Sequence, residues 1–176
     1  MISRCFHAAA TIVSLAVLLE GNGASATTLK ALSLEQLAAR AELVVRGRPV
    51  QRRCEWRGRL IYTVTSIDVT QTLKGRAPGA LRVLQLGGVV GQTAMPVPGV
   101  ADLGLDQEMV LFLRRDPGLD GEFVVVGMSQ GKLGVGAGGE LVWAPTAALW
   151  DGRVLRSPAP RRLSWDALQR ALGGAR

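Results

Sequence analysis

Histidine is almost absent from this 176-residue chain. Its single histidine, His7, lies in an N-terminal segment that we expect to be removed on export, which would leave the mature chain with none. Histidine is the commonest general base near neutral pH and the commonest metal ligand. Its absence excludes a Ser–His–Asp triad and nearly excludes a zinc site made by the chain itself. We therefore expect no catalytic set, no metal and no cofactor.

Cysteine is nearly as scarce, because Cys5 lies in the same N-terminal segment and Cys54 is the one cysteine of the expected mature chain. A single cysteine cannot form an intramolecular disulfide, so an apolar core must hold the fold together. Two alternatives stay open for Cys54. It is either buried and inert, or exposed among arginines and able to form a disulfide with another chain.

A hydrophobic run long enough to cross a membrane is also missing. The apolar run 8–19 has twelve residues, which is too short for a bilayer and typical of a secretory signal. The small-residue pattern Ala24-Ser25-Ala26 then resembles a cleavage site. We expect residues 1–26 to be a signal peptide and the product to be periplasmic or extracellular, without a transmembrane segment. A retained N-terminal anchor is the alternative.

Lysine is rare, with only Lys30, Lys74 and Lys132, so arginine carries nearly all of the positive charge. The formal net charge is +7. Arginine stays charged at any working pH and binds carboxylate or phosphate through two parallel hydrogen bonds. Codon bias in a GC-rich genome explains most of the excess of arginine, but the net positive charge of the protein still favours an anionic partner. We expect no specific nucleic-acid partner.

The residues that are present predict a strand-rich domain between two short helices. Ser33 and Gln36 match a capping box, and Ser164 matches the N-cap of a helix over 164–172. Residues 145–160 are typical of a connector. Alternating and β-branched patterns predict strands at 43–50, 59–73, 80–86, 109–113, 123–126, 132–135 and 140–143.

These patterns fit a single mainly-β domain over residues 27–176. Its length and strand spacing predict a small OB-like barrel or closed sandwich of about five to seven strands. A short N-terminal helix and a short C-terminal helix flank the strands. The long strand 59–73 is expected to contain a bulge or a bend.

Several short motifs match known sites but lack the context that their chemistry needs. The glycines of 134–139 match a dinucleotide-binding pattern, yet a strand pattern follows them, which favours a hairpin turn. Ser129 and Lys132 match the S-x-x-K of penicillin-binding enzymes, but a sequence between strands predicts no helix there. The acidic residues of 102–108 lack the glycine of a calcium loop.

One concentration of charge remains as a candidate site. Six arginines and a tryptophan lie within the fourteen residues 46–59, and a hairpin would gather the arginines at its open end. Guanidinium groups beside an aromatic ring could hold an anionic ligand, with the loop 87–104 as an adaptable element. Alternatively, the charges protect a strand edge from aggregation. The candidate ligand-binding residues are Arg46, Arg48, Arg52, Arg53, Trp56, Arg57 and Arg59.

The order of several short motifs resembles a group of small secreted bacterial proteins that are largely uncharacterised. These motifs are AELVVRG at 41–47, LKG at 73–75, the glycine pair 87–88, VLFL at 110–113 and VGMSQGK at 126–132. More distantly, the first two motifs and the helix and strand beside them are similar to the netrin-like modules of the tissue inhibitors of metalloproteinases. That resemblance implies an OB-type barrel.

The same resemblance implies little about mechanism. Those inhibitors place an N-terminal cysteine on the protease zinc and contain several disulfides, whereas this mature chain would begin at Thr27. We therefore predict an exported, non-catalytic binding or interaction module for an unknown protein or an anionic envelope component. A protease-inhibitor-like module is the first alternative, and a hydrolase with an unrecognised carboxylate or serine site is the second.

Overall fold

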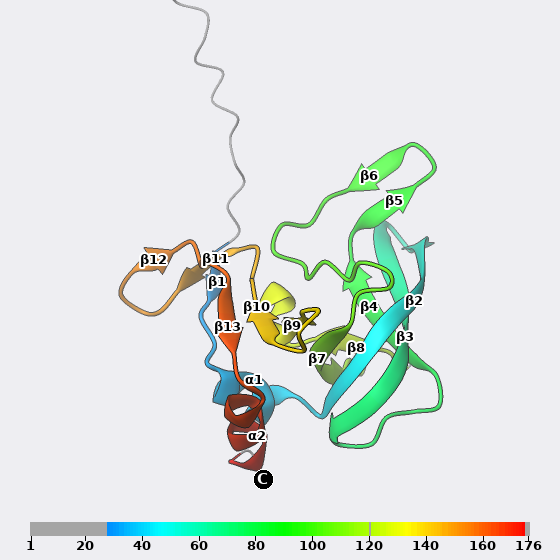
Figure 1. Cartoon of the computed structure of the whole chain (residues 1–176). Helices are drawn as coiled ribbons and strands as arrows, with labels where there is room; N and C mark the ends of the chain where they lie inside the picture. The colour runs from blue at the N-terminus through cyan, green and yellow to red at the C-terminus, as the bar shows by residue number, and fades with distance from the viewer. Residues whose placement is uncertain (1–27, 120, 175–176) are drawn as a thin grey trace, which may run out of the picture.

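A computed structural model describes residues 28–119 and 121–174, and the expected signal peptide 1–26 lies outside them. Within the described residues the chain is mainly β, with a short helix near each end (Figure 1). In chain order, the elements are β1 (Thr28–Lys30), α1 (Leu34–Arg40), β2 (Leu43–Arg57), β3 (Leu60–Lys74), β4 (Leu81–Leu86), β5 (Gly88–Val90), β6 (Thr93–Met95), β7 (Met109–Arg115), β8 (Phe123–Val125), a 3-10 helix (Met128–Gly131), β9 (Lys132–Val135), β10 (Leu141–Trp143), β11 (Ala148–Trp150), β12 (Leu155–Arg156), β13 (Arg161–Leu163) and α2 (Trp165–Gly173).

Five strands form a partly closed ring in the order β2-β3-β4-β8-β7 and back to β2. Neighbouring strands are antiparallel except for β4 and β8, which are parallel and meet at the single pair Val83–Phe123. Strands β9, β10 and β13 extend the sheet outward from β7. The prediction of a mainly-β fold with two short flanking helices is confirmed, and the ring is compatible with an OB-like barrel.

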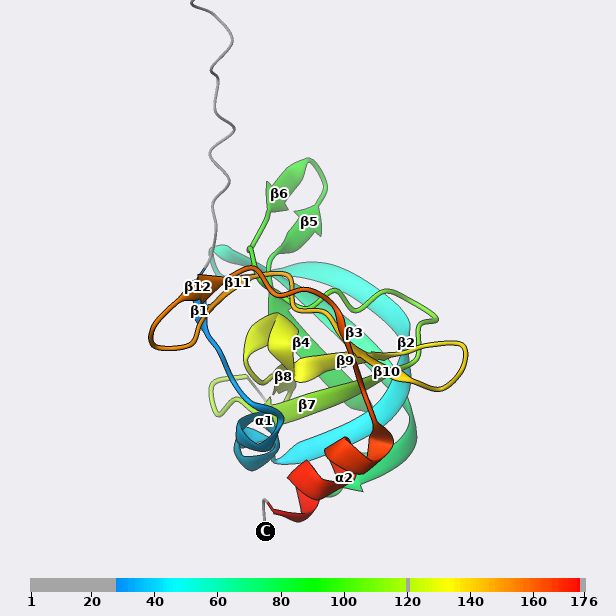
Figure 2. The ribbon, with the colours of Figure 1, turned by 60° about the vertical axis from the view of Figure 1, so that its left-hand side comes forward.

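The long strands β2 and β3 form one hairpin, which curves to make up one side of this ring, as Figure 2 shows. Its pairing shifts register between Val44 and Val45, between Arg46 and Gly47, and across Val50. Such irregularities bend a strand pair and increase its twist. A Cβ at Gly47 would overlap the carbonyl oxygen of Asp68, so the two strands approach closely there. The expected irregularity of the long strand is therefore present.

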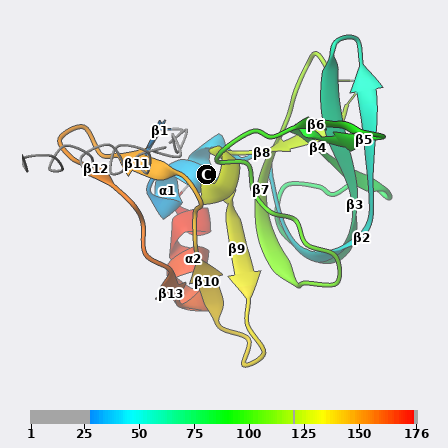
Figure 3. The ribbon, with the colours of Figure 1, turned by 90° about the horizontal axis from the view of Figure 1, so that it is seen from above.

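Two apolar cores lie on opposite faces of β2 and β7, because successive side chains of a strand point to opposite faces. Val45 and Leu111 belong to the inner core, which fills the ring together with residues of β3, β4 and β8. Val44 and Phe112 belong to the outer core, which α1 and α2 cover. Figure 3 shows the helices and the ring side by side. The ring thus has an outer layer packed against one side.

Both helices begin where the sequence indicates. Ser33 accepts a hydrogen bond from the backbone of Gln36, whose side chain in turn accepts one from the Ser33 N–H. Ser164 accepts a hydrogen bond from the Ala167 N–H at the start of α2. These bonds satisfy N–H groups that have no partner inside the helix. No helix in the described part of the chain is long and apolar enough to cross a membrane.

The segment 145–160 is more ordered than a connector. It contains β11 and β12, and β11 pairs in parallel with β1 far back in the sequence. Leu149 of β11 and the neighbouring Leu29 of β1 pack against the outer core. β11 and β12 are only three and two residues long, which is too short for an alternation of apolar and polar residues to be recognised in the sequence.

Candidate functional site

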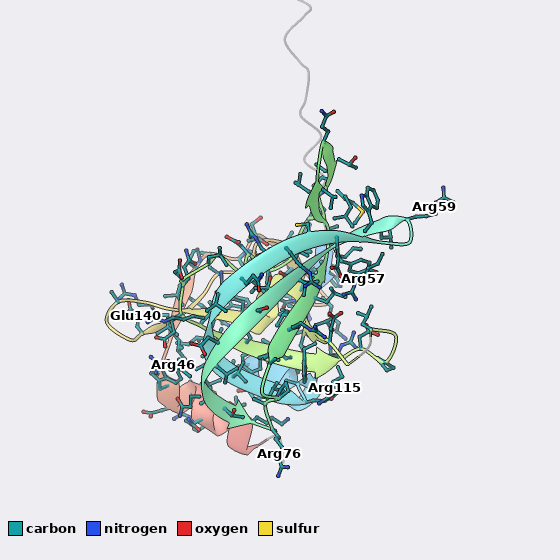
Figure 4. The ribbon with its side chains drawn as sticks, turned by 90° about the vertical axis from the view of Figure 1, so that its right-hand side faces the viewer. Arg46, Arg57, Arg59, Arg76, Arg115 and Glu140 are labelled. Carbon is teal, nitrogen blue, oxygen red and sulfur yellow. The ribbon has the colours of Figure 1, made fainter. Side chains whose placement is uncertain are left out.

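The arginines of segment 46–59 do not form one patch. Strand β2 continues to Arg57, so the arginines are spread along fifteen residues instead of gathering at an open end. Alternation then separates them, with Arg53 and Arg57 on one face of the hairpin and Arg52 and Trp56 on the other. Figure 4 shows Arg46 and Arg59 at opposite ends of the hairpin. The expected gathering of the arginines at one place is therefore wrong.

Arg57 belongs to an ion-pair network with buried Glu122. Its Nη1 and Nη2 atoms donate to the two carboxylate oxygens of Glu122 at 2.6 and 3.1 Å. Glu55 accepts from Arg57 at 2.7 Å and from Arg53 at 3.0 Å. The bonds to Glu122 and Glu55 raise the pKa of the Arg57 guanidinium, and the bond from Arg57 lowers the pKa of Glu55. Arg82 also lies 3.7 Å from Glu122, so three arginines share two carboxylates. Arg53 and Arg57 thus each have a carboxylate partner within the protein.

Arg46 is also neutralised, at the opposite end of β2. Its Nη2 atom donates to Glu108 at 2.8 Å, which lowers the pKa of that carboxyl. The guanidinium lies 5.2 Å from the centre of the Trp165 ring, where a cation–π contact joins β2 to α2. The ion pair and the ring contact indicate that Arg46 has a structural role.

Arg48 lines a polar cleft of about 380 Å³ between the residues 106–108 and the turn that follows β9. Both Asp106 and Glu108 line this cleft, so acidic groups already face the guanidinium. Arg59 lies in the turn of the β2–β3 hairpin and points away from the protein in Figure 4.

Arg52 lies at a different kind of surface, which we call the mouth groove. This groove has a volume of about 310 Å³ and lies where the β5–β6 arm leaves the sheet. Polar side chains reach it from three adjacent strands, namely Arg52 of β2, Thr63 of β3 and Gln85 of β4. The remaining lining comes from Leu86–Val89, Ala94–Val97 and Val100–Leu103. It is mainly apolar, and Asp102, whose carboxylate interacts with Lys132, is its one acidic residue.

Hydrogen bonds fix both walls of the mouth groove to the sheet. Thr63 Oγ1 donates to the Gly87 carbonyl at 2.7 Å, and the Gly87 N–H donates to the Ile61 carbonyl at 2.8 Å. On the other wall, Gln85 Nε2 donates to the Ala101 carbonyl at 2.7 Å. The loop 87–104 is thus anchored on two sides. Sequence reasoning included this loop but missed Thr63 and Gln85, because a β-branched residue and a glutamine in strands carry no functional signal.

Lys132 adds a third anchor for the same loop. Its Nζ atom donates to the carbonyl oxygen of Asp102. Burial lowers the pKa of this lysine, with a smaller opposing effect from the Asp102 carboxylate. The lysine of the S-x-x-K match is therefore used to hold the wall of the mouth groove.

Cys54 lies half-buried at the base of the β5–β6 arm. Its Sγ atom is 3.3 Å from Thr63 Oγ1, and a Cβ added to Gly88 would come within 2.7 Å of the sulfur. The arm therefore covers the thiol closely. A disulfide from Cys54 to another chain stays a prediction.

The other motif matches have structural explanations. The segment Met128–Gly131 forms one turn of 3-10 helix, so the expectation of no helix there was wrong. Ser129 Oγ accepts from the Thr146 N–H at 3.1 Å, and Gln130 bonds the backbone of Leu32 and of Lys30. The glycines 134–139 join β9 and β10 as a hairpin turn, as predicted.

No protein-family model matches the chain, and no curated protein matches it in sequence. In residues 28–119 and 121–174, no three His, Cys, Asp or Glu side chains come together as a metal-ligand group. The functional argument therefore rests on the geometry of the clefts and on the charges that face them.

Proposed function

We propose that this chain is an exported, non-catalytic binding module and that the mouth groove binds its ligand. The ligand class is an apolar molecule or segment that carries an anionic group. One observation supports this choice above the others. Arg52 lines a mainly apolar groove and forms no ion pair with any residue that the structure describes, Asp102 of the same groove included, whereas Arg46, Arg53 and Arg57 each have a carboxylate partner.

The physical chemistry of the groove favours such a ligand. Removing apolar ligand surface from water contributes roughly 25 cal/mol per Å². A guanidinium beside apolar walls binds an anion more strongly than it would in open water, because the walls exclude solvent. The groove volume of about 310 Å³ falls near the lower end of the range for small-molecule sites.

A fluorescent anion with an aromatic body tests the proposal directly. We expect 1-anilinonaphthalene-8-sulfonate to bind the native protein and the Arg52→Glu variant to bind it about tenfold more weakly, since a repulsive charge replaces the attractive one. Arg59→Glu is the matched control, because it makes the same charge change on the same hairpin outside the groove. Equal weakening by both variants would indicate a general charge effect and reject the mouth groove as the site.

The protease-inhibitor-like alternative is supported by the β5–β6 arm, which projects from the ring in Figures 1 and 2. Val89 on this arm has 60% of its surface exposed. An exposed hairpin of this kind could enter a protease cleft as an extended segment. Val89→Asp should abolish inhibition of any protease that the native protein inhibits, and an unchanged inhibition constant would exclude the arm.

A further inference from the structure

A second exposed surface lies on the β11–β12 hairpin and does not depend on the mouth groove. Trp150, Val154 and Leu155 are 43%, 49% and 51% exposed, and we call them the hairpin patch. Trp150 and Leu155 are directly opposite one another in the strand pairing, so their side chains share one face. The adjacent Leu149 points the other way and is buried in the outer core. The hairpin patch is therefore additional apolar surface that the fold does not need for its core.

The loop that carries the patch satisfies its polar groups internally. Asp151 Oδ1 accepts hydrogen bonds from the N–H groups of Arg153 and Val154 at 2.8 and 2.9 Å. The Asp151 N–H donates back to the Val154 carbonyl at 3.4 Å. The bonds from Val154 and Arg153 lower the pKa of the Asp151 carboxyl. Polar groups that are already paired cost less free energy when the loop leaves bulk water.

Cations surround the hairpin patch. Arg153 and Arg156 lie on the hairpin itself, and Arg156 is 3.5 Å from the Asp151 carboxylate. Lys30 of β1 is paired in register with Trp150. The charges on β1, β11, β12 and the loop 151–154 are thus two arginines and one lysine against a single carboxylate. This balance is complementary to an anionic surface.

We propose that the hairpin patch docks on the surface of an anionic phospholipid membrane. The two aliphatic side chains enter the boundary of the acyl chains, and Trp150 lies at the level of the headgroups, which is the depth that tryptophan prefers. The arginines bind lipid phosphates, and each basic residue near such a surface strengthens the attachment. Figure 3 shows β12 and the β2–β3 hairpin at opposite sides of the molecule.

Vesicle flotation with the full chain tests this proposal. We expect binding to vesicles of phosphatidylcholine with about 30% phosphatidylglycerol and weaker binding to pure phosphatidylcholine. The double variant Val154→Ser/Leu155→Ser should lower the partition coefficient at least about tenfold, because it removes two buried aliphatic groups. Val50→Ser/Leu105→Ser is the matched control, since this valine and this leucine are exposed elsewhere in the fold and outside the mouth groove. All variants carry the same N-terminus, so the apolar run 8–19 contributes equally to each.

Two further measurements separate the membrane from other occupants. Arg153→Glu/Arg156→Glu should remove the preference for anionic vesicles. Lipids brominated on their acyl chains should quench the tryptophan fluorescence of the native protein but leave that of Trp150→Phe largely unchanged. Equal flotation of the native protein and the Val154→Ser/Leu155→Ser variant would overturn the proposal. A native dimer in gel filtration that becomes a monomer in the same variant, without vesicle binding, would assign the patch to contact between copies instead.

Discussion

Arg52 and Arg53 are neighbours in the sequence but have different surroundings in the structure. Successive side chains of a strand point to opposite faces, so Arg53 reaches Glu55 while Arg52 reaches the mouth groove. Glu122 has the decisive role on the first face, because it lies just before β8, far from Arg57 in the sequence, and forms an ion pair with it. At the scale of residues, the carboxylates therefore decide which arginine is available to a ligand.

The ion pair between Arg57 and the buried Glu122 leads to a stability prediction. Glu122→Gln should lower the free energy of unfolding by about 2–3 kcal/mol, because it leaves the Arg57 charge without its buried partner. Glu55→Gln should cost clearly less, since the Glu55 side chain is more exposed to solvent than that of Glu122. Urea unfolding followed by circular dichroism measures both values. A loss for Glu55→Gln that equals the loss for Glu122→Gln would contradict this assignment.

The β5–β6 arm and the β2–β3 hairpin act together as elements. The arm leaves the sheet through Gly87 and Gly88, which both have positive φ values of 99° and 144°. A side chain at Gly88 would meet Cys54 Sγ and Thr63 Oγ1 at 2.7 Å. The glycines thus allow the arm to lie directly on the hairpin, and this contact defines one wall of the mouth groove.

We therefore expect Gly88→Ala to loosen the arm. The added Cβ should destabilise the protein by about 1–3 kcal/mol, as overpacking in a close contact does, and should speed hydrogen exchange of the amides in 87–103. Gly79→Ala is the control, because nothing lies within 4 Å of its Cβ position. Mass spectrometry of peptic fragments gives the exchange rates. Unchanged rates in Gly88→Ala would show that the arm does not depend on this contact.

At the scale of the whole molecule, β2 and β7 connect the two cores. Leu111 is completely buried in the inner core, and the next residue, Phe112, is completely buried in the outer core. If β7 left the sheet, the apolar residues of both cores would be exposed to water. The ring and its helical layer should therefore unfold as one cooperative unit, as a single domain does.

Substitutions at these two neighbours test that cooperativity. Leu111→Ala and Phe112→Ala should each cost about 2–5 kcal/mol, since each leaves a cavity in a buried core. In both variants, far-UV circular dichroism and tryptophan fluorescence should give coincident unfolding transitions. Two separate transitions in either variant would indicate that the cores belong to independent units.

Much of the element order could be predicted from local sequence, because the relevant signals lie within a few residues. The helix caps at Ser33 and Ser164 are local, and so is the glycine turn between β9 and β10. The strands β1, β11 and β12 could not be predicted, because they are only two or three residues long. In addition, β1 and β11 pair across 120 positions of the sequence. Their stability comes from partners that the local pattern does not contain.

The sequence by itself determined the class of the fold and reduced the number of catalytic and metal-binding mechanisms that the chain can use. Scarce histidine and cysteine argued against common catalytic and zinc sites, and alternating β-branched residues determined that strands dominate. Only the tertiary structure decided which charges remain available. Glu122 neutralises Arg57 although 65 positions separate them, and loop 87–104 covers the sheet beside Arg52. The physical reason is that charge and burial depend on distances in space, which ring closure sets and composition does not.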